Sequence, residues 1–422
     1  MALYAFILGR KKLLSVAELC SMLGIHARII DITPDALIAE LPEPLTHPQE
    51  SLDRLGGTIS IAEIFRETSK AKEQDHSAID TAVGEFLTTK FAGRPNKLNY
   101  GISISSMTIK HDQILKKTLQ ILKKNLIAAG IKSRFINKNF RNPETAAIHG
   151  EKLVPEGSHI QVIQGNHHYF YGTTVALQNL EKYTQRDYNR PGRDPHLGML
   201  PPKLAQMMIN FAGKTQLQNP PPPRQLLYDP FVGIGTVLTE GLLAGFEVAG
   251  SDINDDALAK AHKNIDWTTL TFNIIASQPR LLNKDATMLT KKELPESPAA
   301  IVTESYLGPP VSQFPQPEHI QKTFINIHGT LVRFFKAIKP LLKPGTPIVI
   351  SFLAYKRQDR YFFLENLPQE LARQGWHAEP LIPNEISKKF GLHTYARLGL
   401  IYDRPDQIVC REIWKFTNKN AP

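Results

Sequence analysis

The first 75 residues alternate between apolar runs with the spacing of strands and runs with the spacing of helices. The alternation predicts four strands, at Tyr4–Leu8, Ala27–Ile32, Leu37–Leu41 and Thr58–Phe65. Helices are expected around Val16, Leu19 and Leu23 and again near Leu52–Leu55. The resulting β-α-β-β-α-β order is that of a ferredoxin-like module, which we expect over residues 1–75.

A second α+β segment is expected over residues 76–182. The pattern predicts helices at Ile79–Phe91 and Asp112–Ala129 and strands at Tyr100–Ser105, Ser133–Asn137, His159–Gln164 and His168–Thr174. The second helix places its leucines on one stripe, which should face the core, and its lysines away from that stripe. Those lysines form either a solvated face or a phosphate-binding face, and the pattern leaves both interpretations open.

Net charge favours the phosphate-binding interpretation of that face. The chain carries a formal charge of +10, and residues 101–150 hold nine Lys and Arg against two acidic residues, a net charge of +7. A concentrated basic region is typical of proteins that bind a polyanion. The candidate RNA-binding residues here are Lys116, Lys117, Lys123, Lys124, Arg134, Lys138 and Arg141.

The rest of the chain predicts a connector and an α/β domain. Residues 183–224 are rich in Arg, Asp and Pro, include a helix that begins near Pro202, and end in the proline run Pro220–Pro223. From residue 225 to 422 strands and helices alternate, as in a mostly parallel sheet. The final strands, Leu398–Tyr402 and Ile408–Phe416, should form an antiparallel hairpin, which is typical of the methyltransferase version of this sheet.

Composition excludes several other classes of protein. The most apolar stretch, Pro347–Tyr355, is far shorter than the ~20 residues that a membrane-spanning helix needs. Cys20 and Cys410 lie almost a chain length apart and form no metal-ligand cluster, so a disulfide scaffold or zinc site is not expected. An ordinary protein of the reducing cytoplasm fits these features.

A glycine-rich turn between a strand and a helix is the strongest chemical motif. In the segment QLLYDPFVGIGTVLTEG, Gly233 and Gly235 follow the predicted strand Gln225–Tyr228 and precede the helix Thr236–Leu243. Leu238 stands where a dinucleotide-binding loop has its third glycine, and Asp229 would face a pyrophosphate unfavourably. A cofactor without phosphates and with a free amino group, S-adenosylmethionine, fits better.

Two further aspartates support this cofactor. Asp252 closes the next strand, where a carboxylate can accept hydrogen bonds from both ribose hydroxyls, and Asp285 follows the third strand near the expected adenine. Each aspartate alone could equally be a turn residue or helix cap. The candidate cofactor-binding residues are Asp229, Phe231, Gly233, Gly235, Thr236, Asp252, Ile253, Asp285 and Ala286.

The candidate catalytic residues follow the fourth strand, Ala300–Thr303. In open α/β sheets the chemistry occurs at the carboxyl end of a central strand. There Glu304 can orient or deprotonate an attacking amine, Tyr306 can stack on a base, and Ser305 lies between them. As an isolated segment, this could equally be a loop that ends at Pro309 and Pro310.

Taken together, these motifs resemble those of the THUMP-domain tRNA guanine-N2-methyltransferases, which modify the guanosine at the tenth position of tRNA. The connector QRDYNRPGRDPHLGMLPP, the loop DPFVGIGT and the segment GSDIN carry the resemblance, and the order of modules extends it over essentially the whole chain. It implies a class I Rossmann-like methyltransferase sheet preceded by an α+β ferredoxin-like plus THUMP-like module. It also implies S-adenosylmethionine as cofactor, no metal, tRNA as partner and RNA or inter-module contacts for Arg186, Arg190 and Arg193.

The catalytic loop departs from that family. The family sequence Asp-Pro-Pro-Tyr-Gly is replaced by Glu304-Ser305-Tyr306-Leu307-Gly308, so the stacking aromatic would come one position early. We therefore expect methyl transfer to an exocyclic amine of a tRNA base, with guanine N2 as the first choice. A DNA amino-methyltransferase and a non-catalytic RNA-binding protein with a degenerate loop remain as alternatives.

Overall fold

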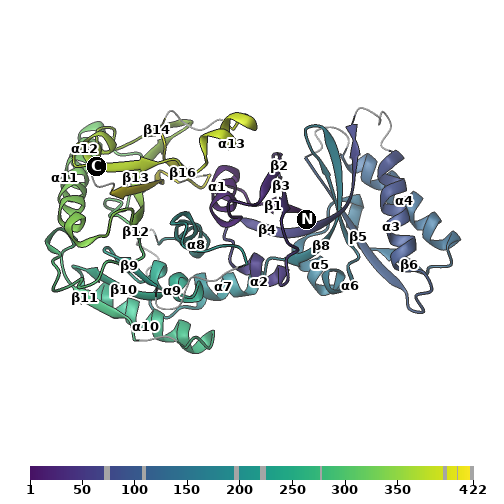
Figure 1. The fold of residues 1–422 in the computed structure, drawn as a ribbon, viewed down its shortest axis with the longest axis horizontal. Helices are drawn as coiled ribbons and strands as arrows, with labels where there is room; N and C mark the ends of the chain where they lie inside the picture. The colour runs from purple at the N-terminus through teal and green to yellow at the C-terminus, as the bar shows by residue number, and fades with distance from the viewer. Residues whose placement is uncertain are drawn as a thin grey trace. The chain divides into compact units, whose positions relative to one another are not determined.

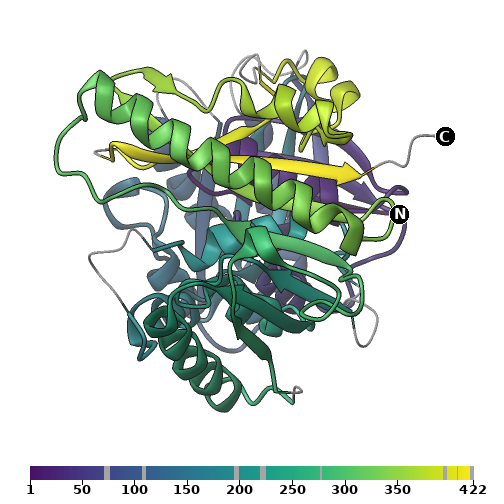
Figure 2. The same ribbon diagram turned by 90° about the vertical axis from the view of Figure 1, so that its left-hand side faces the viewer.

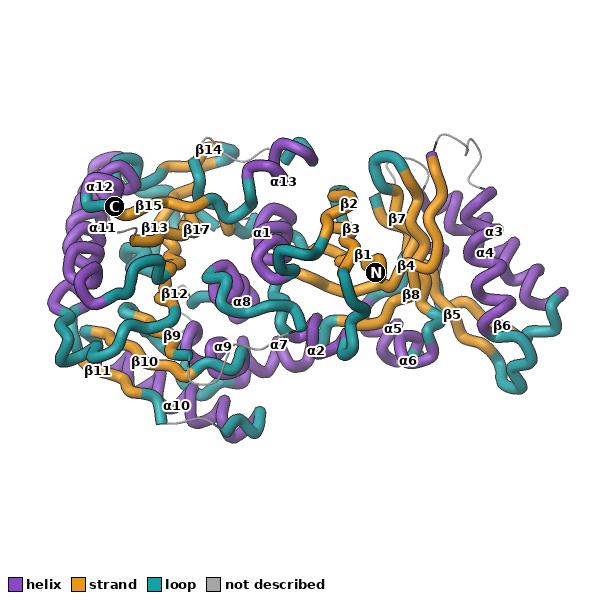
Figure 3. The backbone as a smooth tube through the Cα atoms, in the orientation of Figure 1, coloured by secondary structure: helices purple, strands orange, loops and turns teal. Residues whose placement is uncertain are grey.

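Two units, each built on its own sheet, make up the computed structural model of the protein (Figures 1 and 3). The N-terminal unit holds residues 1–12, 23–53 and 57–179, and the C-terminal unit holds residues 13–22, 54–56 and 180–422. The structure describes residues 1–70, 77–106, 111–193, 199–218, 225–275, 278–392, 397–405 and 407–418. The predicted run Pro220–Pro223 and residues 194–198 of the connector lie outside these ranges.

Eight strands form the sheet of the N-terminal unit, in the order β2-β3-β1-β4-β8-β7-β5-β6. They are β1 (Ala2–Leu8), β2 (Arg28–Ile32), β3 (Ala36–Leu41), β4 (Thr58–Ser69), β5 (Leu98–Ser105), β6 (Ser133–Phe135), β7 (His159–Gln164) and β8 (His168–Leu177). The first four pair antiparallel as 2-3-1-4, in the predicted β-α-β-β-α-β order. Because β4 pairs with β8, strands from both predicted modules share one sheet. The boundaries at residues 75, 182 and 224 stay predictions.

Six helices accompany the described part of this sheet. They are α2 (Pro48–Asp53), α3 (Ser77–Lys90), α4 (His111–Ala128), η2 (Lys138–Phe140), α5 (Thr145–Gly150) and α6 (Leu153–Glu156). Of these, α2, α3 and α4 lie where the sequence pattern predicts helices. The α4 stripe is fully buried in a core shared with α3 and β5, as predicted: Leu115, Leu119, Leu122 and Leu126.

Helix α1 (Lys12–Met22) belongs to the C-terminal unit although it lies between β1 and β2 in sequence. Its buried Glu18 accepts hydrogen bonds from the Gly56 amide and the Asn210 side chain, both at 2.8 Å. Asn210 lies in α8 (Pro202–Phe211), so the C-terminal unit includes a helix from near the start of the sequence.

The C-terminal sheet has the order β11-β10-β9-β12-β13-β17-β15, with β14 beside β13 and β16 beside β17. Its strands are β9 (Leu226–Asp229), β10 (Glu247–Asp252), β11 (Arg280–Asn283), β12 (Ala300–Glu304), β13 (Pro347–Arg357), β14 (Arg360–Phe362), β15 (Trp376–Glu379), β16 (Leu400–Tyr402) and β17 (Val409–Asn418). The five strands β11, β10, β9, β12 and β13 run parallel to one another. Strand β17 is antiparallel to its neighbours β13 and β15. The main-path order is thus 3-2-1-4-5-7-6, the doubly wound arrangement with an antiparallel strand inserted.

The terminal hairpin is confirmed, since β16 pairs antiparallel with β17. Strand β17 also inserts between β13 and β15, which its own sequence pattern does not indicate. Helices flank the sheet: α7 (Leu180–Thr184), the π-helix η3 (Gln185–Asn189), α9 (Thr236–Leu243), α10 (Asp255–Thr271), η4 (Ala286–Met288), α11 (Pro317–Ile338), η5 (Lys339–Leu341), α12 (Leu367–Arg373) and α13 (Asn384–Lys389). Figure 2 shows α11 lying across β17, where Phe335 meets Phe416 with ring centroids 5.4 Å apart.

Within the part of the chain that the structure describes, we find no helix with the length and apolar character needed to cross a membrane.

Candidate active site

Acidic side chains from three strands meet at one edge of the C-terminal sheet. Asp229, Asp252 and Glu304 end β9, β10 and β12, which run parallel, so their carboxyl ends lie together. Asp229 lies opposite Gly250 in the strand register. Thr303, one residue before Glu304, donates a 2.6 Å hydrogen bond to Asp229. The structure thus brings the predicted cofactor and catalytic carboxylates to one edge.

The glycine-rich turn has the backbone that the sequence pattern requires. Gly233 and Gly235 adopt φ values of 53° and 83°, in the left-handed region that favours glycine. Gly235 caps α9, and a Cβ there would lie 3.1 Å from the Cβ of Ala261. Gly250 of β10 is also required, because a Cβ there would lie 2.3 Å from Val232. Sequence reasoning missed Gly250, since nothing local marks a close approach between strand and loop.

Asp252 is held by the turn itself. Its Oδ2 accepts the Gly233 amide at 2.8 Å and its Oδ1 accepts the Asn254 amide at 2.9 Å. Each carboxylate oxygen has two lone pairs, so both can accept another hydrogen bond from a ligand. The side chain is therefore oriented before anything binds.

Asp229 lies deeper, with 1% of its surface exposed. Its Oδ1 accepts both Thr303 and, at 3.0 Å, the Phe231 amide. Burial raises the pKa of Asp229 to about 7, and these two hydrogen bonds only partly oppose the rise. A cation placed beside this group would draw it to the charged form near neutral pH.

The third aspartate occupies a different setting. Asp285 is exposed, and its Oδ1 accepts the Thr287 amide at 2.8 Å as the N-cap of η4. This is the helix-cap role that the sequence left open, with Ala286 buried behind it. The contact of Asp285 with an adenine stays a prediction, and so does the cofactor contact expected of the exposed Ile253.

Glu304 is held by a residue from the far end of the domain. Arg411 of β17 donates from its Nε to Oε1 of Glu304, and the two side chains are 5% and 19% exposed. This charge-assisted bond fixes one carboxylate oxygen at the sheet edge. Sequence reasoning missed Arg411, because only the insertion of β17 brings it near β12.

The loop after β12 divides its residues between structure and solvent. Ser305 is buried and donates its hydroxyl and its amide to the Ser351 carbonyl, at 2.8 and 3.1 Å. Leu307 packs against the hydrophobic core, whereas Tyr306 is 63% exposed. Tyr306 is thus the aromatic ring that this loop presents to solvent. Catalytic roles for Glu304, Ser305 and Tyr306 stay predictions.

The connector is bonded to the glycine-rich turn. Arg190 is buried and donates to the Thr236 hydroxyl at 2.6 Å, and Arg186 forms a 2.6 Å ion pair with the buried Glu240 of α9. Asn264 of α10 accepts the Gly192 amide at 2.7 Å and donates to the Ile234 carbonyl at 2.8 Å. Arg186 and Arg190 therefore join the connector to the turn, and contact of either with RNA stays a prediction. Glu240 and Asn264 were missed, since only the fold reveals their partners.

The predicted basic residues of the N-terminal unit are exposed. Lys117, Lys123 and Lys124 project from α4, opposite its buried leucines. Lys116 lies over the Phe140 ring at 5.3 Å, and Arg134 pairs with Glu151 at 2.7 Å. Lys138 and Arg141 are exposed as well. Exposure fits both the solvated and the phosphate-binding interpretation, so the role of these residues stays a prediction.

Among the described residues, no group of three or more His, Cys, Asp or Glu side chains is placed to hold a metal ion.

Comparison with known proteins identifies short matching stretches. No family model matches the chain. It is 32% identical over 113 residues to a tRNA (guanine(10)-N2)-dimethyltransferase of Methanothermobacter thermautotrophicus, covering 26% of this chain and 31% of the relative. The protein of that name from Pyrococcus abyssi is 34% identical over 86 residues, which cover 20% and 22%. The Type II methyltransferase M.MvaI of Kocuria varians is 46% identical over 56 residues, covering 13% and 11%. The chain thus spans less than a third of the length of these relatives.

Solved structures match over the whole chain. The crystal structure of TrmN from Thermus thermophilus aligns with a TM-score of 0.53 and 14% identity, covering 99% of each chain. The fold is that of a class I methyltransferase. A possible methylase from Clostridium difficile 630 aligns with a TM-score of 0.51 and 10% identity, covering 100% of this chain and 99% of the other. The predicted fold class, a methyltransferase sheet preceded by an α+β module, is confirmed.

Proposed function

We propose that this protein is an S-adenosylmethionine-dependent methyltransferase that modifies an exocyclic amine of a tRNA base, with guanine N2 as the first choice. The observation that carries the proposal is the single sheet edge where Asp229, Asp252 and Glu304 meet beside a left-handed glycine turn. The short stretches shared with relatives named tRNA (guanine(10)-N2)-dimethyltransferase favour this substrate.

The cofactor contacts follow from charge and geometry. The Asp252 oxygens accept both ribose hydroxyls, and the buried Asp229 faces the cationic end of the cofactor, at the turn formed by Gly233 and Gly235. When bound, S-adenosylmethionine supplies an electrophilic methyl group on a sulfonium. Little more than alignment is then needed from the protein, so proximity and orientation provide most of the rate.

Residues of the loop after β12 contact the amine that accepts the methyl group. Glu304, oriented by Arg411, would accept a hydrogen bond from the attacking amine and stabilise the positive charge that develops on its nitrogen, or accept the proton that the nitrogen releases. The exposed Tyr306 stacks on the base. In this proposal Glu304 takes the place of the aspartate in the family sequence Asp-Pro-Pro-Tyr-Gly. Tyr306, one position earlier than the family's tyrosine, supplies the aromatic ring.

The N-terminal unit is the RNA-delivery part of this proposal. Its basic face on α4 contacts phosphates, and its second segment acts as a THUMP-like module that holds the acceptor end of tRNA. We place the protein in the cytoplasm, where tRNA is processed.

Methyl transfer tests the proposal directly. Purified protein is incubated with methyl-labelled S-adenosylmethionine and, in parallel, unmodified tRNA transcripts and double-stranded DNA, and the labelled nucleoside is then identified by mass spectrometry. Labelled N2-methylguanosine supports the proposal. Label in DNA alone favours the DNA amino-methyltransferase, and cofactor and tRNA binding without transfer favours the non-catalytic alternative.

A further inference from the structure

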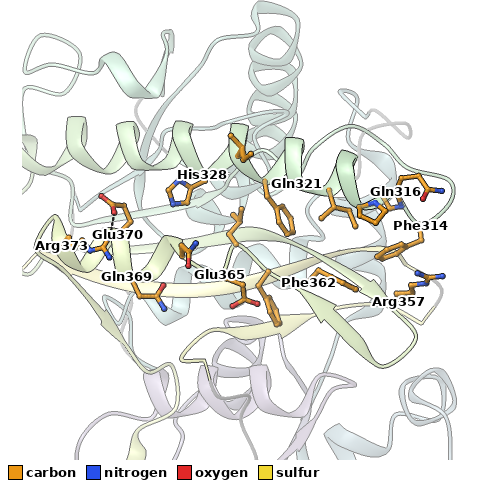
Figure 4. A pocket seen from close by; sticks show the side chains of 18 residues that line it. Phe314, Gln316, Gln321, His328, Arg357, Phe362, Glu365, Gln369, Glu370 and Arg373 are labelled. Atoms are coloured by element: carbon orange, nitrogen blue, oxygen red, sulfur yellow. Dashed lines mark hydrogen bonds and ion pairs between the residues drawn. The ribbon is translucent and has the colours of Figure 1, made fainter.

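A groove of about 1080 Å³ runs along the C-terminal unit between α11 and the segment from β14 to α12. Figure 4 shows side chains of α11 along one side and those of residues 357–373 along the other. None of its lining residues is among the predicted catalytic or cofactor residues. The side chains that line the groove indicate what kind of ligand it binds.

One end of the groove is aromatic and cationic. Phe314 and Phe362 lie with ring centroids 5.4 Å apart, and the Arg357 guanidinium lies 5.2 Å from the Phe314 ring. Phe362 is 37% exposed, so part of a flat apolar ring is available. Aromatic rings and guanidinium planes are the surfaces on which unpaired bases stack.

Side-chain amides line both walls of the groove. Gln316 and Gln321 line it from α11 and the residue before it, and Asn366 and Gln369 line it from the opposite wall. Within the described ranges these four amides form no hydrogen bond to protein. An amide both donates and accepts, which suits the mixed hydrogen-bonding edge of a nucleobase.

Positive charge in the groove is concentrated at its aromatic end. Glu370 pairs with Arg373 at 2.8 Å, and Glu365 shares Arg397, at 2.7 Å, with the buried Glu412. Arg357 has no carboxylate partner among the described residues. A phosphate beside the stacked base would therefore meet an uncompensated guanidinium.

The groove also begins at the substrate edge of the sheet. The segment that leads to Phe314 leaves β12 directly after Glu304, and Arg357 ends the neighbouring strand β13. Tyr355 of β13 links the two, with its ring 6.4 Å from Phe314. The strand register pairs Glu304 with Ser351, and Arg357 lies six residues further along β13, roughly 20 Å away at about 3.3 Å per residue. An RNA strand whose target base lies at Glu304 can thus follow β13 and place a nucleotide several positions away in the groove.

We propose that this groove binds an unpaired nucleotide of the same RNA, several positions from the methylated one, with its base against Phe362 and its phosphate at Arg357. The inference rests on the proposed RNA substrate. It assigns recognition of the local RNA structure to the C-terminal unit itself.

Binding of full-length tRNA by the whole protein, followed by fluorescence anisotropy, tests the base contact. Phe362→Ala should weaken binding by about 5- to 150-fold, the range for loss of one stacked base. Phe362→Trp, which keeps a stacking surface, should stay near wild type. Leu270→Ala, at an 82% exposed position of α10, is the matched control and should change nothing. Thermal melting and cofactor binding check that each variant is folded.

The phosphate contact has its own pair of variants. Arg357→Gln should flatten the log–log salt dependence of binding by about one unit, as expected for one phosphate contact. Arg360→Gln, across the hairpin from Arg357 and outside the groove, should leave the slope unchanged.

The two proposals fail in different ways. Unchanged tRNA affinity in both Phe362→Ala and Arg357→Gln, in a protein that methylates tRNA, overturns the groove and leaves the activity standing. Weakened RNA binding in those variants, without methyl transfer by the wild type to any RNA, supports the groove and overturns the activity. A wild type that binds no RNA overturns both.

Discussion

The two halves of the proposed active site, a cofactor side at Asp252 and an acceptor side at Glu304, differ in how firmly their side chains are held. On the cofactor side, backbone amides fix both oxygens of Asp252, and the connector is bonded to the turn through Arg190 and Asn264. On the acceptor side, Glu304 is held through one arginine and Tyr306 is 63% exposed. A small ligand of constant shape favours a preorganised site, whereas a structured RNA can bring part of the order itself. The cofactor side is thus preorganised, and the acceptor side is less so.

The largest effect is expected on the acceptor side. Glu304→Ala should lower turnover at least about 100-fold, because it removes the carboxylate that orients the amine and stabilises the positive charge on its nitrogen. Cofactor binding should be unchanged if the two halves are independent. Single-turnover kinetics with tRNA and calorimetry with the cofactor measure the two quantities. Glu304→Gln separates the roles, since it should cost less if the residue only orients the amine. Full activity in Glu304→Ala would mean that the acceptor site lies elsewhere.

Asp252→Ala should weaken cofactor binding about 10- to 150-fold, from the loss of about 1.5–3 kcal/mol of charged hydrogen bonds to the ribose. Asp256→Ala is the control, since this carboxylate is exposed in the first turn of α10. Calorimetry on both variants measures the difference. Unchanged affinity in a folded Asp252→Ala protein would exclude the ribose contact.

The buried Asp229 predicts a pH dependence confined to the cofactor side. Burial raises the pKa of the Asp229 carboxyl to about 7, so this carboxyl is mostly protonated below pH 7 and mostly charged above it. A cationic ligand binds the charged form, so cofactor affinity should rise with pH up to about 7, by at most about tenfold per unit, and then level off. Asp229→Asn should remove this dependence. A wild-type affinity that is flat between pH 5.5 and 8 contradicts the assignment.

The smallest effect per residue is expected in the other unit, on α4. Neutralising Lys123 and Lys124 together should flatten the salt dependence of RNA binding by about one to two units in a log–log plot. Lys291 and Lys292, exposed in the C-terminal unit, provide the control pair. Equal slopes would assign the α4 lysines to a solvated face.

Sequence predicts the cofactor side better than the acceptor side for a physical reason. The turn, its two left-handed glycines and Asp252 lie within 20 residues of one another, so local spacing carries their geometry. The same holds for the leucine stripe of α4 and the strand order of the first module. Arg411 is 107 residues from Glu304, and no local pattern indicates that pairing. Sequence reasoning missed three more residues for the same reason, because their partners come from other elements: Gly250, Glu240 and Asn264.

Helix α1 bears on how such a protein can be rearranged in evolution. The C-terminal unit needs residues 13–22 and 54–56, through Glu18 and its bonds to Gly56 and Asn210. A gene fragment that begins at residue 180 leaves the Asn210 amide without the carboxylate that it bonds inside the unit. Recombination at that point therefore carries a stability cost, because a buried polar group loses its partner. Exchange of the N-terminal unit therefore requires that the replacement supply an equivalent helix.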